Sequence, residues 1–211
     1  MAQPTYLALI GDVVASRQVA DRAGLQERME TAIREVNDRY GDRIAASFVL
    51  TVGDEFQGLL ITARGLARIL ATLRVAAFPA SLRYGVGVGP LTTPLQPRAL
   101  GMDGPCFHRA RAAIERAERT ETRVEVDAPT GEPAFMIFAT LSSAVRRQWT
   151  DRQRQVHELA MSGETGKSIA ARLGISPSAV SQHLKAANHD AVEAASRVWE
   201  SSIQSAMETP E

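Results

Sequence analysis

Apolar positions in the first part of the chain alternate between strand-like and helix-like spacing. An unbroken apolar run predicts a buried strand over Tyr6–Val14. Apolar residues then recur every three or four positions over Leu25–Tyr40, which predicts an amphipathic helix. Two short apolar segments, Ala46–Val52 and Phe56–Ile61, flank a Gly-Asp turn pair. They predict a β-hairpin with its tip at residues 53–55.

The pattern continues with a helix, a strand and another helix. Helical spacing spans Leu66–Val75, and the strand Leu82–Val88 contains two glycines that indicate a close approach by another group. A helix follows Gly104 as far as about Arg119, Arg123–Val126 is a candidate edge strand, and Ala134–Gln148 is helical. The order β-α-β-β-α-β predicts a split βαβ (ferredoxin-like) α+β domain, with an antiparallel sheet and helices on one face.

The segment from Lys167 to Ala187 has the pattern of a helix-turn-helix motif. Gly174 suits the left-handed residue that ends a helix. Ser176 is a natural N-cap, and Pro177 suits the first position of the second helix. The sequence therefore predicts a domain over residues 1–148, followed by an all-α helix-turn-helix domain over residues 149–211.

The second helix of this motif is a candidate for reading DNA in the major groove. Its glutamine could pair with adenine, and its serines and lysine could reach bases or phosphates. The candidate DNA-binding residues are Lys167, Ser176, Ser178, Ser181, Gln182 and Lys185. A helical hairpin that makes only protein contacts is the alternative. From Trp149 onward the chain has six Lys/Arg and eight Asp/Glu, a formal charge of −2, so a homodimer would help by doubling the footprint.

A further helix over Ala191–Ile203 has one apolar face. That face could pack against the motif or form the interface of a homodimer.

Acidic residues lie near the end of the first strand and at the hairpin tip. Asp12, Asp54 and Glu55 would meet at one edge of the sheet, where their mutual repulsion requires a cation. Oxygen ligands of this kind suit Mg²⁺ or Mn²⁺. Small residues nearby permit a phosphate to approach, so the candidate phosphate-binding residues here are Gly11, Ser16 and Arg17. The alternative is that these acids are ordinary turn residues.

Composition narrows the class of protein. Charges balance to zero with a pI near 6.9, which disfavours non-specific coating of nucleic acid. The lone cysteine, Cys106, cannot form an intrachain disulfide and is expected to be buried. No signal-peptide pattern or membrane-length apolar stretch is present, so a cytoplasmic location is expected.

Several segments together resemble the SatD family over essentially the whole chain. They are Ile10–Arg17, Thr51–Gln57, Arg83–Gly89, Gly101–Pro105, Trp149–Gln153 and the helix-turn-helix.

The N-terminal domain also resembles the palm-type domain of class III nucleotidyl cyclases and GGDEF diguanylate cyclases. That resemblance implies that Asp12 and Asp54 are metal ligands. It also places Gly53, Gly85 and Arg109 among the nucleotide-binding or phosphate-binding candidates. Three positions at which many cyclases have a base-contacting lysine, an asparagine and a catalytic arginine are Leu50, His108 and Ala112 here.

Three functions remain open from the sequence. We expect first a DNA-binding transcriptional regulator whose cyclase-like domain senses a nucleotide with a divalent metal. An active, metal-dependent nucleotidyl cyclase or transferase is the enzymatic alternative. A DNA-binding protein with a catalytically inert dimerisation domain is the third.

Overall fold

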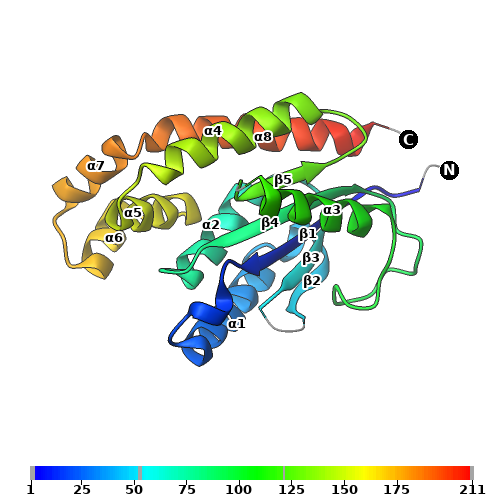
Figure 1. The fold of residues 1–211 in the computed structure, drawn as a ribbon, viewed down its shortest axis with the longest axis horizontal. Coiled ribbons are helices and arrows are strands. Elements are labelled where there is room, and N and C mark those ends of the chain that lie inside the picture. The colour runs from blue at the N-terminus through cyan, green and yellow to red at the C-terminus, as the bar shows by residue number, and fades with distance from the viewer. Residues whose placement is uncertain (1–2, 52–53, 121, 210–211) are drawn as a thin grey trace.

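The computed structural model describes residues 3–51, 54–120 and 122–209. Figure 1 shows the chain coloured from its N-terminus to its C-terminus. The elements, in order, are β1 (Tyr6–Val13), η1 (Ser16–Gln18), α1 (Arg22–Arg39), η2 (Gly41–Arg43), β2 (Ile44–Leu50), β3 (Phe56–Leu60), α2 (Leu66–Ala77), β4 (Leu82–Gly89), α3 (Pro105–Arg119), β5 (Val124–Asp127), α4 (Glu132–Arg147), α5 (Asp151–Ser162), α6 (Gly166–Leu173), α7 (Pro177–Ala186) and α8 (His189–Glu208).

The sheet has the strand order β2-β3-β1-β4-β5, so β1 is central, as the split βαβ pattern predicts. β1 runs antiparallel to both β3 and β4. The expectation of an antiparallel sheet is wrong at one edge, because β5 pairs parallel with β4. The chain reaches β5 through α3, and a crossover helix of this kind returns the chain in the direction of the preceding strand.

Helices cover both faces of the sheet, whereas one covered face was expected. α1 and α2 pack on the face that carries Leu7, Leu9 and the other large apolar side chains, and α3 packs on the opposite face (Figure 1). The glycines of β4 make the second layer possible. A Cβ at Gly85 would lie 2.1 Å from a backbone oxygen of α3, and one at Gly87 would lie 2.0 Å from another. The close approach predicted at β4 is therefore made by α3.

The last helix returns to the core of the N-terminal domain. Four buried α8 residues belong to the same apolar cluster as β1, α1 and α2: Trp199, Ile203, Ala206 and Met207. The Trp199 ring stacks on Phe138 of α4, with centroids 4.7 Å apart. α8 therefore follows α7 in the sequence but packs on the core of the N-terminal domain. The boundary between residues 148 and 149 stays a prediction.

Polar contacts fasten α8 to the start of α2. No side chain of the first turn caps α2, and its N-cap is Gly65. The Glu200 carboxylate accepts instead from the backbone N–H groups of Gly65 (3.1 Å) and Ala67 (2.7 Å). Gln204 accepts from the Thr62 hydroxyl at 2.7 Å in the preceding loop. Because the first N–H groups of a helix lack partners within it, Glu200 supplies a cap from across the fold.

α6 and α7 are joined by the predicted turn, and together with α5 they share a small apolar cluster against which Val75 of α2 also packs. Gly174 has φ 63° and ends α6 in the left-handed conformation. The Ser176 hydroxyl accepts from the Ala179 N–H at 3.1 Å, and Pro177 begins α7. A capping box between Thr150 and Gln153 begins α5. The predicted helix end at Gly174, cap at Ser176 and helix start at Pro177 are confirmed. Within the described ranges, no helix combines the length and apolar character needed to cross a membrane.

Candidate functional site

The carboxylate at the end of β1 is held by an arginine from the neighbouring strand. Asp12 lies opposite Arg83 in the β1–β4 register. Arg83 donates from Nε and Nη2 to the two Asp12 oxygens at 2.7 and 2.8 Å. Its Nη1 lies 2.9 Å from Glu118 on α3. The hydrogen bond to Asp12, opposed by partial burial, raises the pKa of Arg83, so this guanidinium remains charged beside the carboxylate.

A second ion pair neutralises the carboxylate next to the hairpin tip. Arg111 on α3 donates to the two oxygens of Glu55 at 2.5 and 2.7 Å. This hydrogen bonding raises the pKa of Arg111. The cation that the sequence requires between these acids is thus provided by arginines of β4 and α3.

The described acids do not fit a divalent cation in this arrangement. Both oxygens of Asp12 and both of Glu55 are bound by guanidinium groups, and Asp54 is half-buried near the tip. Over residues 3–51, 54–120 and 122–209, no three His, Cys, Asp or Glu side chains cluster as metal ligands would. Mg²⁺ or Mn²⁺ binding would require Arg83 or Arg111 to release its partner.

Other predicted nucleotide-binding positions have structural partners. A Cβ at Gly11 would lie 2.3 Å from the Phe56 ring, so the aromatic ring occupies the space that was expected to admit a phosphate. Gly85 is covered by α3, which removes it from the candidate nucleotide surface. Arg109 donates to the Val88 carbonyl at 2.6 Å. Ser16 begins η1 and is half-buried; the Arg17 side chain and Gly53 lie outside the described residues.

The predicted DNA-reading face is exposed. All six candidates are exposed: Lys167, Ser176, Ser178, Ser181, Gln182 and Lys185. Ser181 donates to the Pro177 carbonyl at 3.2 Å, and Ser176 caps α7. Within the described chain, the side chains of Lys167, Gln182 and Lys185 have no hydrogen bond or ion pair. The face therefore presents three unengaged polar side chains on two adjacent helices.

The lysines of the chain lie only on this surface. The chain has only two lysines, Lys167 and Lys185, and its other basic residues are all arginine. Both lysines lie on the helix-turn-helix, one in α6 and one in α7. This distribution can be read from the sequence. It means that a reagent specific for lysine side chains would modify this surface.

A buried charged network below the motif was not predicted. Glu158 on α5 is 4% exposed, and its carboxylate binds Arg146 of α4 through a short ion pair. Its other oxygen lies 3.8 Å from Arg74 of α2. His157 is completely buried beside them, and its Nδ1 lies 3.2 Å from Nδ1 of His189. These residues come from four helices, and no local motif joins them.

The predicted burial of Cys106 is confirmed, since the residue is fully buried under β4. Burial raises the pKa of its thiol to about 11, so the thiolate is scarce at neutral pH.

Comparison with protein families shows to which family the chain belongs. The SatD family profile matches residues 6–192, which includes the sheet domain and the helix-turn-helix. The chain belongs to the SatD family. The resemblance predicted from the sequence motifs is confirmed. No curated protein matches the SatD chain.

Solved structures similar to the SatD chain include nucleotidyl cyclases. One structure of a bacterial light-regulated adenylyl cyclase has 12% identity and a TM-score of 0.44 over 58% of this chain, which spans 43% of that protein. A second such structure has 13% identity and a TM-score of 0.44, covering 71% of this chain and 83% of the other. The catalytic core of a rhodopsin-guanylyl cyclase in complex with ATPαS has 15% identity and a TM-score of 0.41, covering 55% and 73%. We assign no site or activity from likenesses of this size.

Proposed function

We propose that this SatD protein is a DNA-binding transcriptional regulator that reads its site with α7. The observation that carries the proposal is the exposed polar face of α6 and α7, on which Lys167, Gln182 and Lys185 have no partner within the described chain. The turn between the helices is fixed by Gly174 and Ser176, so the orientation of α7 is determined by the backbone. A recognition helix enters the major groove with its N-terminal residues toward the bases.

The charge of this part of the chain favours specific over non-specific binding. Its formal charge from Trp149 onward is −2, so few phosphates can be neutralised by one copy. Arg172 is paired with Glu164 at 2.5 Å, and Arg154 is paired with Asp151. Affinity would then depend on contacts to bases and on two copies acting together.

A homodimer remains part of the proposal. Exposed apolar side chains lie on α4 and α8: Met136, Ile137, Leu141 and Val198. A second copy that covered this surface would remove large apolar area from water. The dimer would place two α7 helices on one duplex.

Sensing of a nucleotide with Mg²⁺ or Mn²⁺ by the N-terminal domain stays a prediction. The arginine partners of Asp12 and Glu55 argue against a metal at those carboxylates in this conformation. We therefore derive no nucleotidyl transfer step from them. Product formation from a nucleoside triphosphate would support the cyclase or transferase alternative, provided that Asp12→Asn abolishes this product formation.

The two lysines provide a direct test of the DNA-binding face. Duplexes would first be selected from a random pool with the full-length protein. The complex would then be treated with an amine-reactive reagent, and labelling at Lys167 and Lys185 quantified by mass spectrometry. We expect selected DNA to protect both lysines. Equal labelling with and without a bound duplex would overturn the assignment of this face.

Affinity measurements on variants complete the test. Gln182→Ala should weaken binding to the selected site roughly 5- to 150-fold, because loss of a base contact costs roughly 1–3 kcal/mol. Lys185→Ala should reduce the salt dependence of binding. Gln18→Ala, at an exposed position of η1, is the matched control and should bind as the wild type does. If no duplex is selected at all, the proposed function is wrong.

A further inference from the structure

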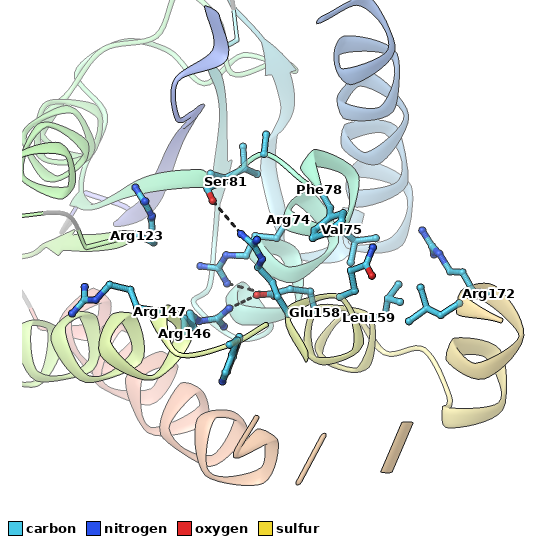
Figure 2. A pocket seen from close by; sticks show the side chains of 16 residues that line it. Arg74, Val75, Phe78, Ser81, Arg123, Arg146, Arg147, Glu158, Leu159 and Arg172 are labelled. Carbon is cyan, nitrogen blue, oxygen red and sulfur yellow. Dashed lines mark hydrogen bonds and ion pairs between the residues drawn. The ribbon is translucent and has the colours of Figure 1, made fainter. Parts of the chain in front are cut away.

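A basic cavity of about 330 Å³ lies where the N-terminal domain meets the helix-turn-helix (Figure 2). Its wall comes from the end of α2, the start of β4, the residue before β5, the end of α4, and α5 and α6. Six arginines line it, with one carboxylate: Arg74, Arg123, Arg146, Arg147, Arg154, Arg172 and Glu158. The cavity therefore spans the predicted boundary at residues 148 and 149.

The arginines of the wall are only partly neutralised. Glu158 is shared by Arg146 and Arg74, which leaves one positive charge in excess. Arg123 and Arg147 have no acidic partner within the described chain and lie at one end of the cavity in Figure 2. These groups give the wall of the cavity an excess of three positive charges. An anion in the cavity would offset this excess and so stabilise the folded chain.

The other two arginines are oriented by neighbours. Arg154 lies 3.4 Å from the Ser81 hydroxyl and is paired with Asp151 outside the wall. Arg172 is paired with Glu164. These two guanidinium groups keep hydrogen-bond donors near the cavity without adding to the uncompensated charge.

We propose that this cavity is a binding site for a small ligand that carries two or more linked phosphates. Guanidinium groups bind phosphate oxygens in pairs, and an excess of three charges matches a di- or triphosphate better than a single carboxylate. The volume lies at the lower end of the range for small-molecule sites. Phe78 and Trp149 in the wall add aromatic surface beside the charged groups. The Asp12–Arg83 pair is separate, because Asp12 and Arg83 lie on the α3 face of the sheet.

The position of the cavity gives the ligand a route to the DNA-binding face. Arg74 comes from α2, Arg123 precedes β5, and Arg146 and Arg147 end α4, whereas α5 and α6 belong to the helix-turn-helix. A polyphosphate that contacted both sides would hold α5 against α2. This coupling rests on the proposed function, but binding of the phosphate does not.

Calorimetry with the full chain tests the site. Inorganic triphosphate, pyrophosphate, ATP and sulfate would be titrated at constant ionic strength into the wild type and into the double variant Arg123→Gln/Arg147→Gln. Arg123 is half-buried and Arg147 exposed, and the network around Glu158 is untouched, so the variant should fold. We expect triphosphate or ATP to bind the wild type, sulfate to bind far more weakly, and the variant to lose at least tenfold in affinity.

A charge-matched control separates the site from the general charge of the protein. Arg22→Gln/Arg64→Gln removes two exposed arginines that are not part of the cavity wall. It should bind as the wild type does. Equal affinity in the two double variants would overturn the proposal, as would the absence of phosphate binding to the wild type.

DNA binding is measured in a separate arm. If triphosphate changes the affinity for the selected duplex in the wild type but not in Arg123→Gln/Arg147→Gln, the regulatory role is supported. If the double variant loses DNA affinity and no small phosphate binds the wild type, the arginines contact DNA and the ligand site is refuted. A protein that binds triphosphate but no duplex would retain the site and lose the proposed function.

Discussion

Burial of His157 should make the stability of this protein fall at mildly acidic pH. The ring lies 4.4 Å from the Trp149 ring, centroid to centroid, and its Nδ1 lies 3.2 Å from Nδ1 of His189. Burial, followed by the charges of Arg146, His189 and Arg74, holds the pKa of His157 well below 6.5. The folded chain therefore keeps this imidazole neutral at a pH at which an unfolded chain would protonate it.

The sign and size follow from linkage. Because the folded pKa is lower than the unfolded one, the unfolded state binds more protons as the pH falls below about 6.5. Each pH unit below that value favours unfolding by about 1.4 kcal/mol, until the folded pKa is reached. At pH 5 the contribution can reach at most roughly 2 kcal/mol. For a chain of this length, a loss of that size lowers the melting temperature by about 4–8 °C.

Urea unfolding at pH 7.5 and pH 5.0 would measure this effect. His157→Phe retains an aromatic ring beside Trp149 but cannot take up a proton. Its loss of stability between the two pH values should be smaller than that of the wild type, by up to about 2 kcal/mol. His108→Gln, at an exposed histidine, should retain the wild-type pH dependence. An identical pH dependence in the wild type and His157→Phe would refute this account of the buried imidazole.

Other substitutions probe the packing and the ion pairs. Trp199→Ala should cost about 3–5 kcal/mol in chemical denaturation, because its ring is 2% exposed, whereas Val198→Ala at the exposed neighbour should cost far less. Gly85→Ala should destabilise by about 1–3 kcal/mol through its clash with the α3 backbone; Gly41→Ala, with nothing within 4 Å of the added Cβ, is the control, and equal melting temperatures would contradict the packing argument. Asp12→Asn should lower the unfolding free energy by about 1–2 kcal/mol, and an increase in stability would show that the carboxylate is strained rather than satisfied by its arginine.

Local features of this fold could be read from the sequence, but their partners could not. The cap at Ser176 depends on a residue three positions further along the chain, so its local pattern is sufficient to predict it. The close approach at Gly85 was predicted, although α3 rather than a nucleotide makes it. A glycine shows that space is needed and does not identify the group that fills it.

Long-range charge pairing explains the remaining differences at the candidate site. The acids at the sheet edge do require a cation, but Arg83 lies 71 positions from Asp12 in the sequence. Hydrophobic periodicity fixes which face a residue occupies and says nothing about which distant guanidinium reaches it. The basic cavity could not be predicted from the sequence either, because its arginines come from separate elements.

The Glu200 cap on α2 has a consequence for how such a chain can be divided. A fragment that ended after α7 would contain every predicted DNA-contacting residue. It would also leave the α2 N–H groups of Gly65 and Ala67 without their carboxylate acceptor and uncover the apolar surface below Trp199. Nicking or premature termination in that region should therefore yield an aggregating product rather than a detached DNA-binding piece. If α6 and α7 were exchanged between relatives, α8 would have to be exchanged with them. The predicted DNA-binding helices and α8 should therefore be inherited as one unit.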